Sequence, residues 1–198
     1  MILFGTTTSP YVRRVRIVAS MLDIPLELQS TATAEGQKKL RELTPIWKVP
    51  VLLDGEQLVF DSHAIIDYLQ DSAGSHALDQ KLKSSIDAIN QLTVIDGALD
   101  SAINVFYFRK DDSTVCTLPY LKKQEERVVA AMSWLEQQCI KGAFEQSSSF
   151  GLKEIAMVST LDWMKFRDAY PIINHPSLCK LAKFFNVFPV FESTQAIE

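Results

Sequence analysis

Residues 48–62 read KVPVLLDGEQLVFDS, and the rest of the chain is organised around this stretch. Short apolar runs on either side of Asp54-Gly55 predict a β-hairpin, because Asp-Gly is a favoured tight turn between two strands. Asp61-Ser62 then predicts a helix start, since short polar side chains cap the first N–H groups of a helix. We therefore expect a hairpin that leads directly into a helix N-terminus.

Pro50 is unusual at the edge of an apolar run, because proline lacks the N–H that an interior strand needs. A cis Val49-Pro50 bond would turn the chain sharply and leave the backbone of Val49 facing outward. An outward peptide edge and a helix N-terminus together suit a small peptide that carries a carboxylate. The stretch thus predicts a cradle for such a peptide.

The bulk composition narrows the possible functions. The 198 residues suffice for one large domain or two modest ones, and 47% hydrophobic with 22% charged residues is typical of globular proteins. A net charge of -4 without a basic block argues against nucleic-acid binding. No apolar run approaches the roughly 20 residues of a membrane span, and no signal-peptide pattern is visible. We expect a cytoplasmic protein with no membrane partner.

Neither the cysteines nor the histidines indicate a special site. An odd number of widely spaced cysteines argues against a disulfide framework and predicts reduced thiols at Cys116, Cys139 and Cys179. No metal-ligand spacing links them to one another or to His63, His76 and His175. The sequence predicts no metal.

The first third of the chain alternates strand and helix signals. Strands are expected at 1–5 and 26–28 and in the hairpin, and helices at 10–22, 33–43 and 62–70. Ser9 is a natural N-cap before Pro10, and Arg13, Arg14 and Arg16 are expected mostly on the face opposite the apolar one. The order β-α-β-α-β-β-α predicts a small mixed sheet flanked by helices, which is the topology of a thioredoxin-like α/β domain over 1–72.

Strand signals stop after the polar stretch 71–75, the best linker candidate. Apolar residues at three- and four-residue steps predict a long helix over 78–106, broken at 112–114, and a second helix over 119–139. A polar loop follows at 141–149. Residues 154–166 are apolar nearly all round, which indicates a buried helix, and a last helix is expected at 176–185. Residues 78–198 are thus predicted to form an all-α helical bundle.

Three motifs in this order resemble the cytosolic glutathione transferase family: SPYVR at 9–13, KVPVL at 48–52 and DSHAIIDYL at 61–69. Residues 150–191 also resemble the C-terminal pattern of the family's bacterial members. The resemblance implies the two-domain glutathione transferase fold and a homodimer. It also implies that glutathione, the substrate of that family, is the co-substrate of this protein.

By this resemblance Ser9 lies beside the glutathione sulfur. A hydroxyl at a helix N-terminus can donate to a thiolate, and the helix dipole favours the charged form, so together they lower the pKa of the bound thiol. Ser9 could instead be an N-cap only, in which case Thr7 or Thr8 could contact the sulfur. A serine rather than a cysteine here disfavours disulfide exchange by a protein thiol.

The resemblance assigns the rest of glutathione to the opening stretch. Val49-Pro50 would hold the cysteinyl backbone, while Asp61 and Ser62 would bind the γ-glutamyl end. Lys48 would reach the glycyl carboxylate. Plain helix capping explains one of Asp61 and Ser62 equally well.

Two positions depart from the family pattern. Trp47 stands where the family commonly has glycine, so the loop before Val49 is bulkier and could narrow the glutathione site. Gly151 replaces the Ser or Thr of the family's capping box, while Glu154 retains the reciprocal bond.

A second-substrate pocket is expected between the two domains, where ligand sites are common. Aromatic and apolar residues that could line it, or could equally be core, are Tyr11, Val12, Phe106, Tyr107 and Trp163. The expected activity is attack of the glutathione thiolate on a small electrophile. Alternatives are a glutathione-dependent isomerase or peroxidase on the same fold, and a non-catalytic protein-interaction module, which Trp47 favours if it blocks the site.

Overall fold

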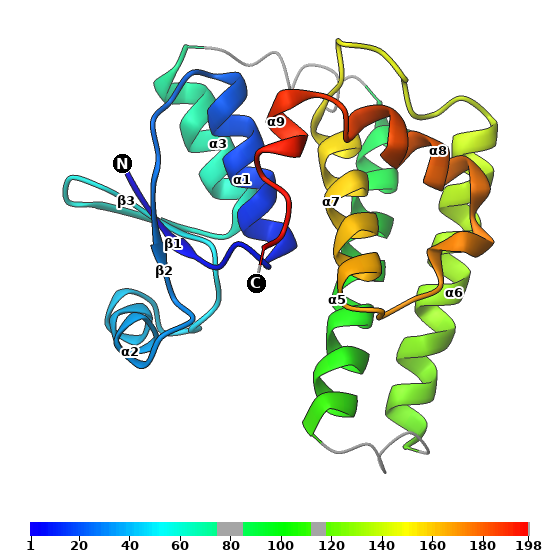
Figure 1. Cartoon of the computed structure of the whole chain (residues 1–198), viewed down its shortest axis with the longest axis horizontal. Coiled ribbons are helices and arrows are strands. Elements are labelled where there is room, and N and C mark those ends of the chain that lie inside the picture. The colour runs from blue at the N-terminus through cyan, green and yellow to red at the C-terminus, as the bar shows by residue number, and fades with distance from the viewer. Residues whose placement is uncertain (75–84, 112–117, 198) are drawn as a thin grey trace. The chain divides into compact units, whose positions relative to one another are not determined.

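The computed structural model describes residues 1–74, 85–111 and 118–197 (Figure 1). The chain forms two compact units: Met1–His76 together with Phe188–Glu198, and Ala77–Val187. The sequence placed residues 78–198 in one domain, whereas 188–198 pack with the first unit. Of the predicted linker, Asp71 and Ser72 still belong to a helix, and Ser75 lies outside the described residues.

The first unit is built on a four-stranded sheet in the order β2-β1-β3-β4. Its strands are β1 (Ile2–Gly5), β2 (Glu27–Ser30), β3 (Val51–Asp54) and β4 (Gln57–Phe60). β1 pairs parallel with β2 and antiparallel with β3, and β3 pairs antiparallel with β4. The predicted mixed sheet is confirmed.

Three helices flank this sheet: α1 (Pro10–Met21), α2 (Ala34–Leu43) and α3 (Ser62–Ser72). α1 and α3 pack together on one face, and α2 lies on the other (Figure 1). Because side chains alternate along a strand, Phe4 and Val51 join Leu40 of α2 in one core cluster, while Leu3 and Leu52 are buried on the opposite face. The thioredoxin-like arrangement predicted for this part is therefore present.

Gly5 fixes how closely the end of β1 approaches α1. A Cβ atom at Gly5 would lie 2.4 Å from Cγ2 of Val12, closer than any ordinary contact. Val12 itself is fully buried. The loop between β1 and α1 consequently starts from a tightly packed point.

The described part of the second unit contains α5 (Ile86–Asp111), α6 (Pro119–Ile140), α7 (Leu152–Phe166) and α8 (Pro176–Phe185), with a 3₁₀ turn, η2 (Ile172–Asn174). α7 packs against both α5 and α8 and is buried along most of its length, which confirms the predicted buried helix. α5 runs past the expected end at Phe106. The predicted start at residue 78 and the break at 112–114 lie outside the described residues.

The start of α7 bears out the altered capping box. The Gly151 N–H donates to Oε2 of Glu154 at 3.0 Å, so the reciprocal bond is kept although glycine has no side chain for the other half. Cys139 and Cys179 are free thiols, and Cys116 lies outside the described residues. None of the described helices is long and apolar enough to span a bilayer.

The prediction that the α1 arginines face away from the core is wrong for two of them. Arg13 is 3% exposed and Arg14 is fully buried. Short helix α9 (Pro189–Glu192) packs on α1, and Arg13 donates to the Phe191 carbonyl at 3.1 Å. The guanidinium of Arg14 lies 5.0 Å from the Tyr11 ring centroid. Guanidinium groups are tolerated in a protein interior where carbonyl oxygens and aromatic faces receive them.

Candidate functional site at one edge of the sheet

The strand register brings the three predicted binding segments to one edge of the sheet. Phe4 pairs with Val51, and Val51 pairs with Phe60, so these residues form one row across three strands. Beyond this row β1 continues into the loop of Thr6–Ser9, the chain enters β3 through Val49-Pro50, and β4 passes into Asp61-Ser62. The N-termini of α1 and α3 therefore both open at this edge.

Ser9 is the N-cap of α1, with extended backbone angles. Its Oγ accepts the Val12 N–H at 3.3 Å and the side chain is half-buried. A hydroxyl carries one O–H donor as well as acceptor lone pairs. Capping uses a lone pair only, so the same hydroxyl can cap α1 and donate to a bound thiolate.

The neighbouring threonine hydroxyls have partners of their own. Thr7 donates to the Ile197 carbonyl at 2.7 Å, and the hydroxyls of Thr6 and Thr8 lie 3.3 Å apart. The Thr7 proton is thus already used. This favours Ser9 over Thr7 as the donor to a sulfur at this edge.

The Val49-Pro50 peptide bond is cis, as the sequence predicts. Pro50 is buried, and Val49 is half-buried against the core cluster on the α2 side. Strand pairing starts at Val51, so the Val49 peptide lies beyond the last pair of the ladder, where a peptide ligand can pair with it. Lys48 is exposed.

Asp61 caps α3 from a backbone conformation that is rare for a side chain other than glycine. Its φ is 81°, and its Oδ1 accepts the His63 N–H at 2.8 Å. Such backbone conformations persist only where the surrounding structure holds them, and they are common at binding sites. Ser62 is 3% exposed, so little of its surface is open to solvent. A helix N-terminus such as that of α3 favours an anion through its N–H groups and dipole.

Tyr68 ties α3 to the hairpin. Its hydroxyl donates to Oδ2 of Asp54 at 2.9 Å, and this bond raises the pKa of Tyr68. The turn end of the hairpin and helix α3 are therefore joined by this bond as well as by the chain connection at Asp61-Ser62. Sequence reasoning missed this bond, because a Tyr on a helix and an Asp in a turn carry no pairing signal.

Trp47 also has left-handed backbone angles, with φ at 53°. Glycine adopts this conformation without steric cost, whereas a tryptophan does not. The Trp47 ring is 57% exposed, and the guanidinium of Arg41, in the last turn of α2, lies 4.9 Å from its centroid. Arg41 thus holds the ring beside the cradle, a contact that no local sequence pattern indicates.

Of the predicted second-substrate residues, the structure brings three together in the helical unit. Phe106 packs edge-to-face on Trp163 with centroids 5.7 Å apart, and on the exposed Tyr107 at 5.3 Å. Arg167, which the sequence did not single out, places its guanidinium 5.5 Å from the Phe106 centroid. The other two candidates, Tyr11 and Val12, lie on α1 in the sheet unit.

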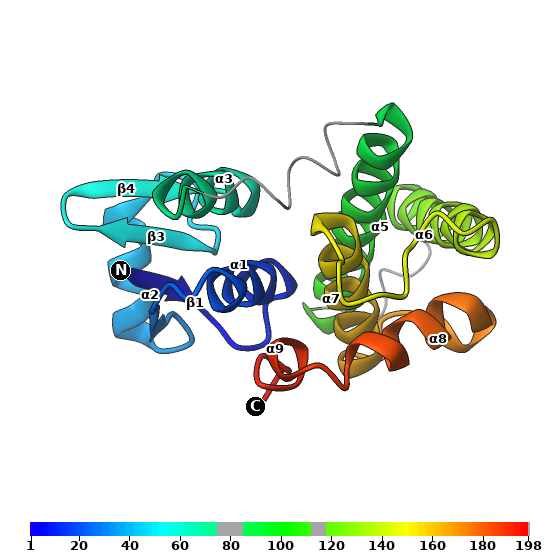
Figure 2. The same cartoon turned by 90° about the horizontal axis from the view of Figure 1, so that it is seen from above.

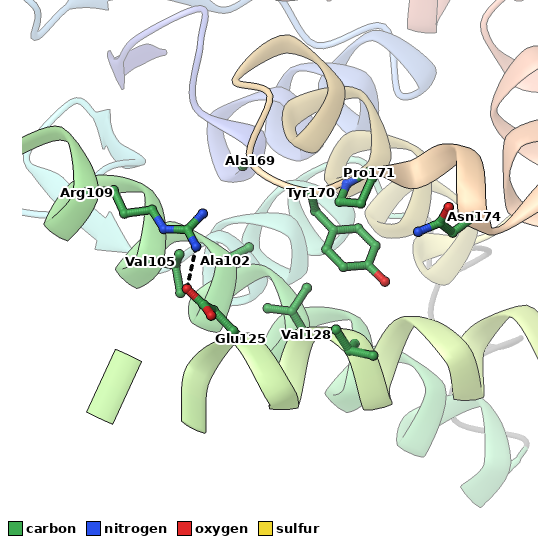
Figure 3. Close-up of a pocket in the computed structure, with 10 residues that line it drawn as sticks. Ala102, Val105, Arg109, Glu125, Val128, Ala169, Tyr170, Pro171 and Asn174 are labelled. Atoms are coloured by element: carbon green, nitrogen blue, oxygen red, sulfur yellow. Dashed lines mark hydrogen bonds and ion pairs between the residues drawn. The ribbon is translucent and has the colours of Figure 1, made fainter. Parts of the chain in front are cut away.

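A separate pocket lies wholly within the helical unit (Figure 3). It has a volume of about 300 Å³ and is lined by α5, α6 and the segment before α8. At one end Arg109 and Glu125 form an ion pair at 2.5 Å, and the Tyr170 hydroxyl lies 2.8 Å from Nε2 of His175. Its charges are already paired, and it contains none of the predicted site residues. Among the residues described, no cluster of His, Cys, Asp and Glu is arranged to hold a metal ion.

The fold and this edge define a class of two-domain protein: a thioredoxin-like sheet with a cis-proline beside two helix N-termini, joined to a helical unit. Residues 3–77 match the family described as glutathione S-transferase, N-terminal domain. The chain is 28% identical to glutathione S-transferase U17 of Arabidopsis thaliana over 92% of this chain and 84% of that protein. It is 24% identical to the uncharacterized GST-like protein YibF of Escherichia coli K12 over 92% of both.

The same fold is seen in a solved structure. The crystal structure of a glutathione S-transferase from Methylobacillus flagellatus KT, with glutathione bound, superposes with a TM-score of 0.86 at 23% identity, over 99% of both chains. Together these findings show that residues 3–77 match the N-terminal domain of glutathione S-transferases and that the chain is similar to proteins of that name over most of its length.

Proposed function

We propose that this protein is a glutathione transferase that binds glutathione at the sheet edge and stabilises its thiolate through Ser9. The observation that carries the proposal is the row Phe4–Val51–Phe60, which gathers the β1–α1 loop, the cis-proline segment and the start of α3. A relative of the same fold has glutathione bound. The glutathione bound in that protein supports the proposal that this edge receives glutathione.

Each part of glutathione meets a group of matching chemistry. The peptide of Val49 offers backbone pairing to the cysteinyl residue, and the N-terminus of α3 offers N–H groups to the γ-glutamyl carboxylate. The Asp61 carboxylate keeps acceptor sites for the γ-glutamyl ammonium beyond the one His63 uses. Lys48 is free to turn toward the glycyl carboxylate because it is exposed.

The chemistry then needs only a stabilised sulfur and a nearby electrophile. The Ser9 O–H and the N-terminus of α1 favour loss of the thiol proton to solvent. The thiolate donates its electron pair to an electrophilic carbon, a sulfur–carbon bond forms, and a leaving group departs with its electrons or the electrophile is protonated. The protein contributes thiolate stabilisation and proximity. Phe106, Tyr107 and Trp163 are proposed to contact the electrophile.

A Ser9→Ala variant tests the thiolate role. We expect the pKa of bound glutathione, followed by thiolate absorbance in the ultraviolet, to rise by about two units, equivalent to about 2.7 kcal/mol. Ser20→Ala, an exposed serine at the other end of α1, is the matched control and should leave this pKa unchanged. An unchanged pKa in Ser9→Ala would move the role to Thr8 or Tyr11. Absence of glutathione binding by calorimetry at millimolar concentration would overturn the function itself.

A homodimer in the cytoplasm is part of the same proposal and rests on the resemblance to cytosolic glutathione transferases. Light scattering on the purified protein should give twice the chain mass of 22.3 kDa. A mass equal to one chain at micromolar concentration would remove the dimer from the proposal and leave the chemistry at Ser9 untouched.

A further inference from the structure

Residues 193–197, called the arm here, follow α9 and run along α1 to the loop that presents Ser9. In Figure 1 the arm descends from α9 to the start of α1, and Figure 2 shows α9 and the arm next to the loop between β1 and α1. It belongs to the same compact unit as the sheet. The sheet edge already provides the groups of the candidate site, so the contact of the arm with this loop needs a role of its own.

The base of the arm is anchored firmly. Phe191, just before it, is fully buried. Arg13 donates through one guanidinium nitrogen to the Phe191 carbonyl at 3.1 Å and through Nε to Oγ1 of Thr194 at 3.4 Å. The Thr194 hydroxyl in turn donates to the Val190 carbonyl at 2.8 Å. Donors and acceptors are thus matched around a buried arginine, which gives the arm one defined position.

A second arginine and a threonine extend this attachment to the tip. Arg16 donates to the carbonyls of Ser193 and Thr194 at 3.3 and 3.4 Å. Thr7 donates to the Ile197 carbonyl at 2.7 Å, the shortest of these contacts. The arm is therefore fastened to α1 at its base and to the β1–α1 loop at its tip.

The loop itself is held by weaker contacts of its own. The Ser9 N–H donates to the Thr6 carbonyl at 3.1 Å, and both the Thr6–Thr8 hydroxyl pair and the Ser9–Val12 cap bond are 3.3 Å long. The two bonds of 3.3 Å are longer than is usual for their type, so they hold the hydroxyls of Thr6, Thr8 and Ser9 only weakly. The bond from Thr7 to the Ile197 carbonyl is shorter and comes from outside the loop, two residues from Ser9.

We propose that the arm is a positioning element for Ser9: the Ile197 carbonyl fixes Thr7, and through it the loop that aims the Ser9 hydroxyl at the glutathione sulfur. The inference rests on the proposed function of that hydroxyl. A hydrogen bond to a thiolate depends on distance and angle, so loss of the external contact should weaken thiolate stabilisation while leaving the remainder of the cradle unchanged.

Two variants remove the contact from opposite sides. Thr7→Val removes the donor with little change of shape, and a chain shortened to end at Gln195 removes the Ile197 carbonyl but keeps every acceptor of Arg13 and Arg16 named above. Thr93→Val is the matched control, because Thr93 is an exposed threonine of α5 whose hydroxyl donates only to the Ile89 carbonyl of its own helix.

The first measurement is the pKa of bound glutathione in each variant. We expect this pKa to rise by about one unit in Thr7→Val and in the shortened chain, and to stay unchanged in Thr93→Val. A rise of one unit means that the ratio of thiolate to thiol at a given pH is roughly tenfold lower than in the wild type. The second measurement is binding of S-methylglutathione, which fills the cradle but forms no thiolate. Its dissociation constant should stay within about twofold of wild type, which a general loss of structure would not allow.

The outcomes separate the two proposals. If the wild type and both variants lower the pKa of bound glutathione equally, the role of the arm is overturned and the proposed function stands. Equal losses of S-methylglutathione binding and of thiolate also overturn it, since the contact would then support folding rather than aim Ser9. A wild type that binds neither glutathione nor its S-methyl derivative overturns the proposed function, and the arm's role with it.

Discussion

At the residue scale, two residues beside the proposed glutathione cradle have backbone conformations that favour glycine. Trp47 and Asp61 have φ values of 53° and 81°. Asp61 uses this geometry to cap α3, the helix whose N-terminus lies at the proposed binding edge. Trp47 is held by Arg41 instead, so part of the stacking energy offsets an unfavourable backbone.

Replacement of Trp47 separates backbone strain from the ring contact. Trp47→Gly and Trp47→Ala both lose the contact with Arg41, but only glycine relieves the left-handed strain. We expect Trp47→Gly to be more stable than Trp47→Ala by about 0.5 to 1 kcal/mol, after allowing for the larger entropy of glycine in the unfolded chain. Urea unfolding of the two variants measures the difference. Equal midpoints would mean that the loop relaxes to a different conformation in the alanine variant.

Gly36 is a second position where a single atom decides the packing. A Cβ atom there would lie 2.3 Å from the Ser30 carbonyl oxygen, a backbone atom that cannot swing aside. Gly36→Ala should therefore destabilise the sheet unit by about 1 to 3 kcal/mol, in spite of alanine's better helix propensity. Gly97→Ala in α5, where nothing lies within 4 Å of the added carbon, is the matched control and should stabilise slightly. Thermal unfolding of both variants tests this contrast.

At the scale of elements, α8 shows how a helix start is completed from another helix. Glu136 of α6 accepts the N–H groups of Ser177 and Leu178 at 2.9 and 3.0 Å. Burial alone would raise the pKa of Glu136, but these two bonds, with the Ser177 side chain and the His175 charge, outweigh it and leave the pKa below its ordinary value. His175, just before α8, is buried and stacks on Tyr170, and burial lowers its pKa in spite of the nearby Glu136 charge.

These shifts predict that acid weakens the helical unit in two stages. A folded-state pKa below the unfolded value means that the unfolded chain binds the proton first, so stability falls as pH drops. His175 should act from about pH 6.5 downward and Glu136 only from about pH 4.5 downward. His175→Gln should abolish the first stage, which urea unfolding between pH 8 and 5 would show. The same slope in variant and wild type would assign that stage to another group.

Most elements could be predicted from the sequence because their signals are local. Asp54-Gly55, Ser9-Pro10 and Asp61-Ser62 are turn and cap signals within a few residues of what they determine, and each lies where expected. The burial of Arg13 and the position of α9 could not be predicted, because their contacts join residues 178 positions apart. At the candidate site the segments were identifiable by motif, whereas the contacts of Arg41 and Ile197 follow only from the folded chain.

At the scale of the whole molecule, the sheet unit is assembled from both ends of the sequence. Residues 188–198 pack with residues 1–76, and the helical unit lies between them in the chain. The first helix thus depends on a segment that follows the last long helix. The match of residues 3–77 to a family model does not predict this dependence, which follows from the contacts of residues 188–197.

Phe191 tests that dependence. Phe191→Ala should cost about 3 to 5 kcal/mol, because a fully buried ring is removed. The loss should appear in the sheet unit: amide hydrogen exchange should accelerate in α1 and leave α7 close to wild type. Acceleration confined to α7 and α8 would show that residues 188–197 belong energetically to the helical unit instead.

The attachment of residues 188–197 to α1 also has a consequence for synthesis. A ribosome releases the sheet segments first, yet the carbonyl that receives Arg13 emerges 178 residues later. Domains usually fold as units in the order in which they leave the ribosome. Here the first unit to emerge is the last to be completed, so the nascent chain carries an unfinished α1 surface until the helical unit has been made.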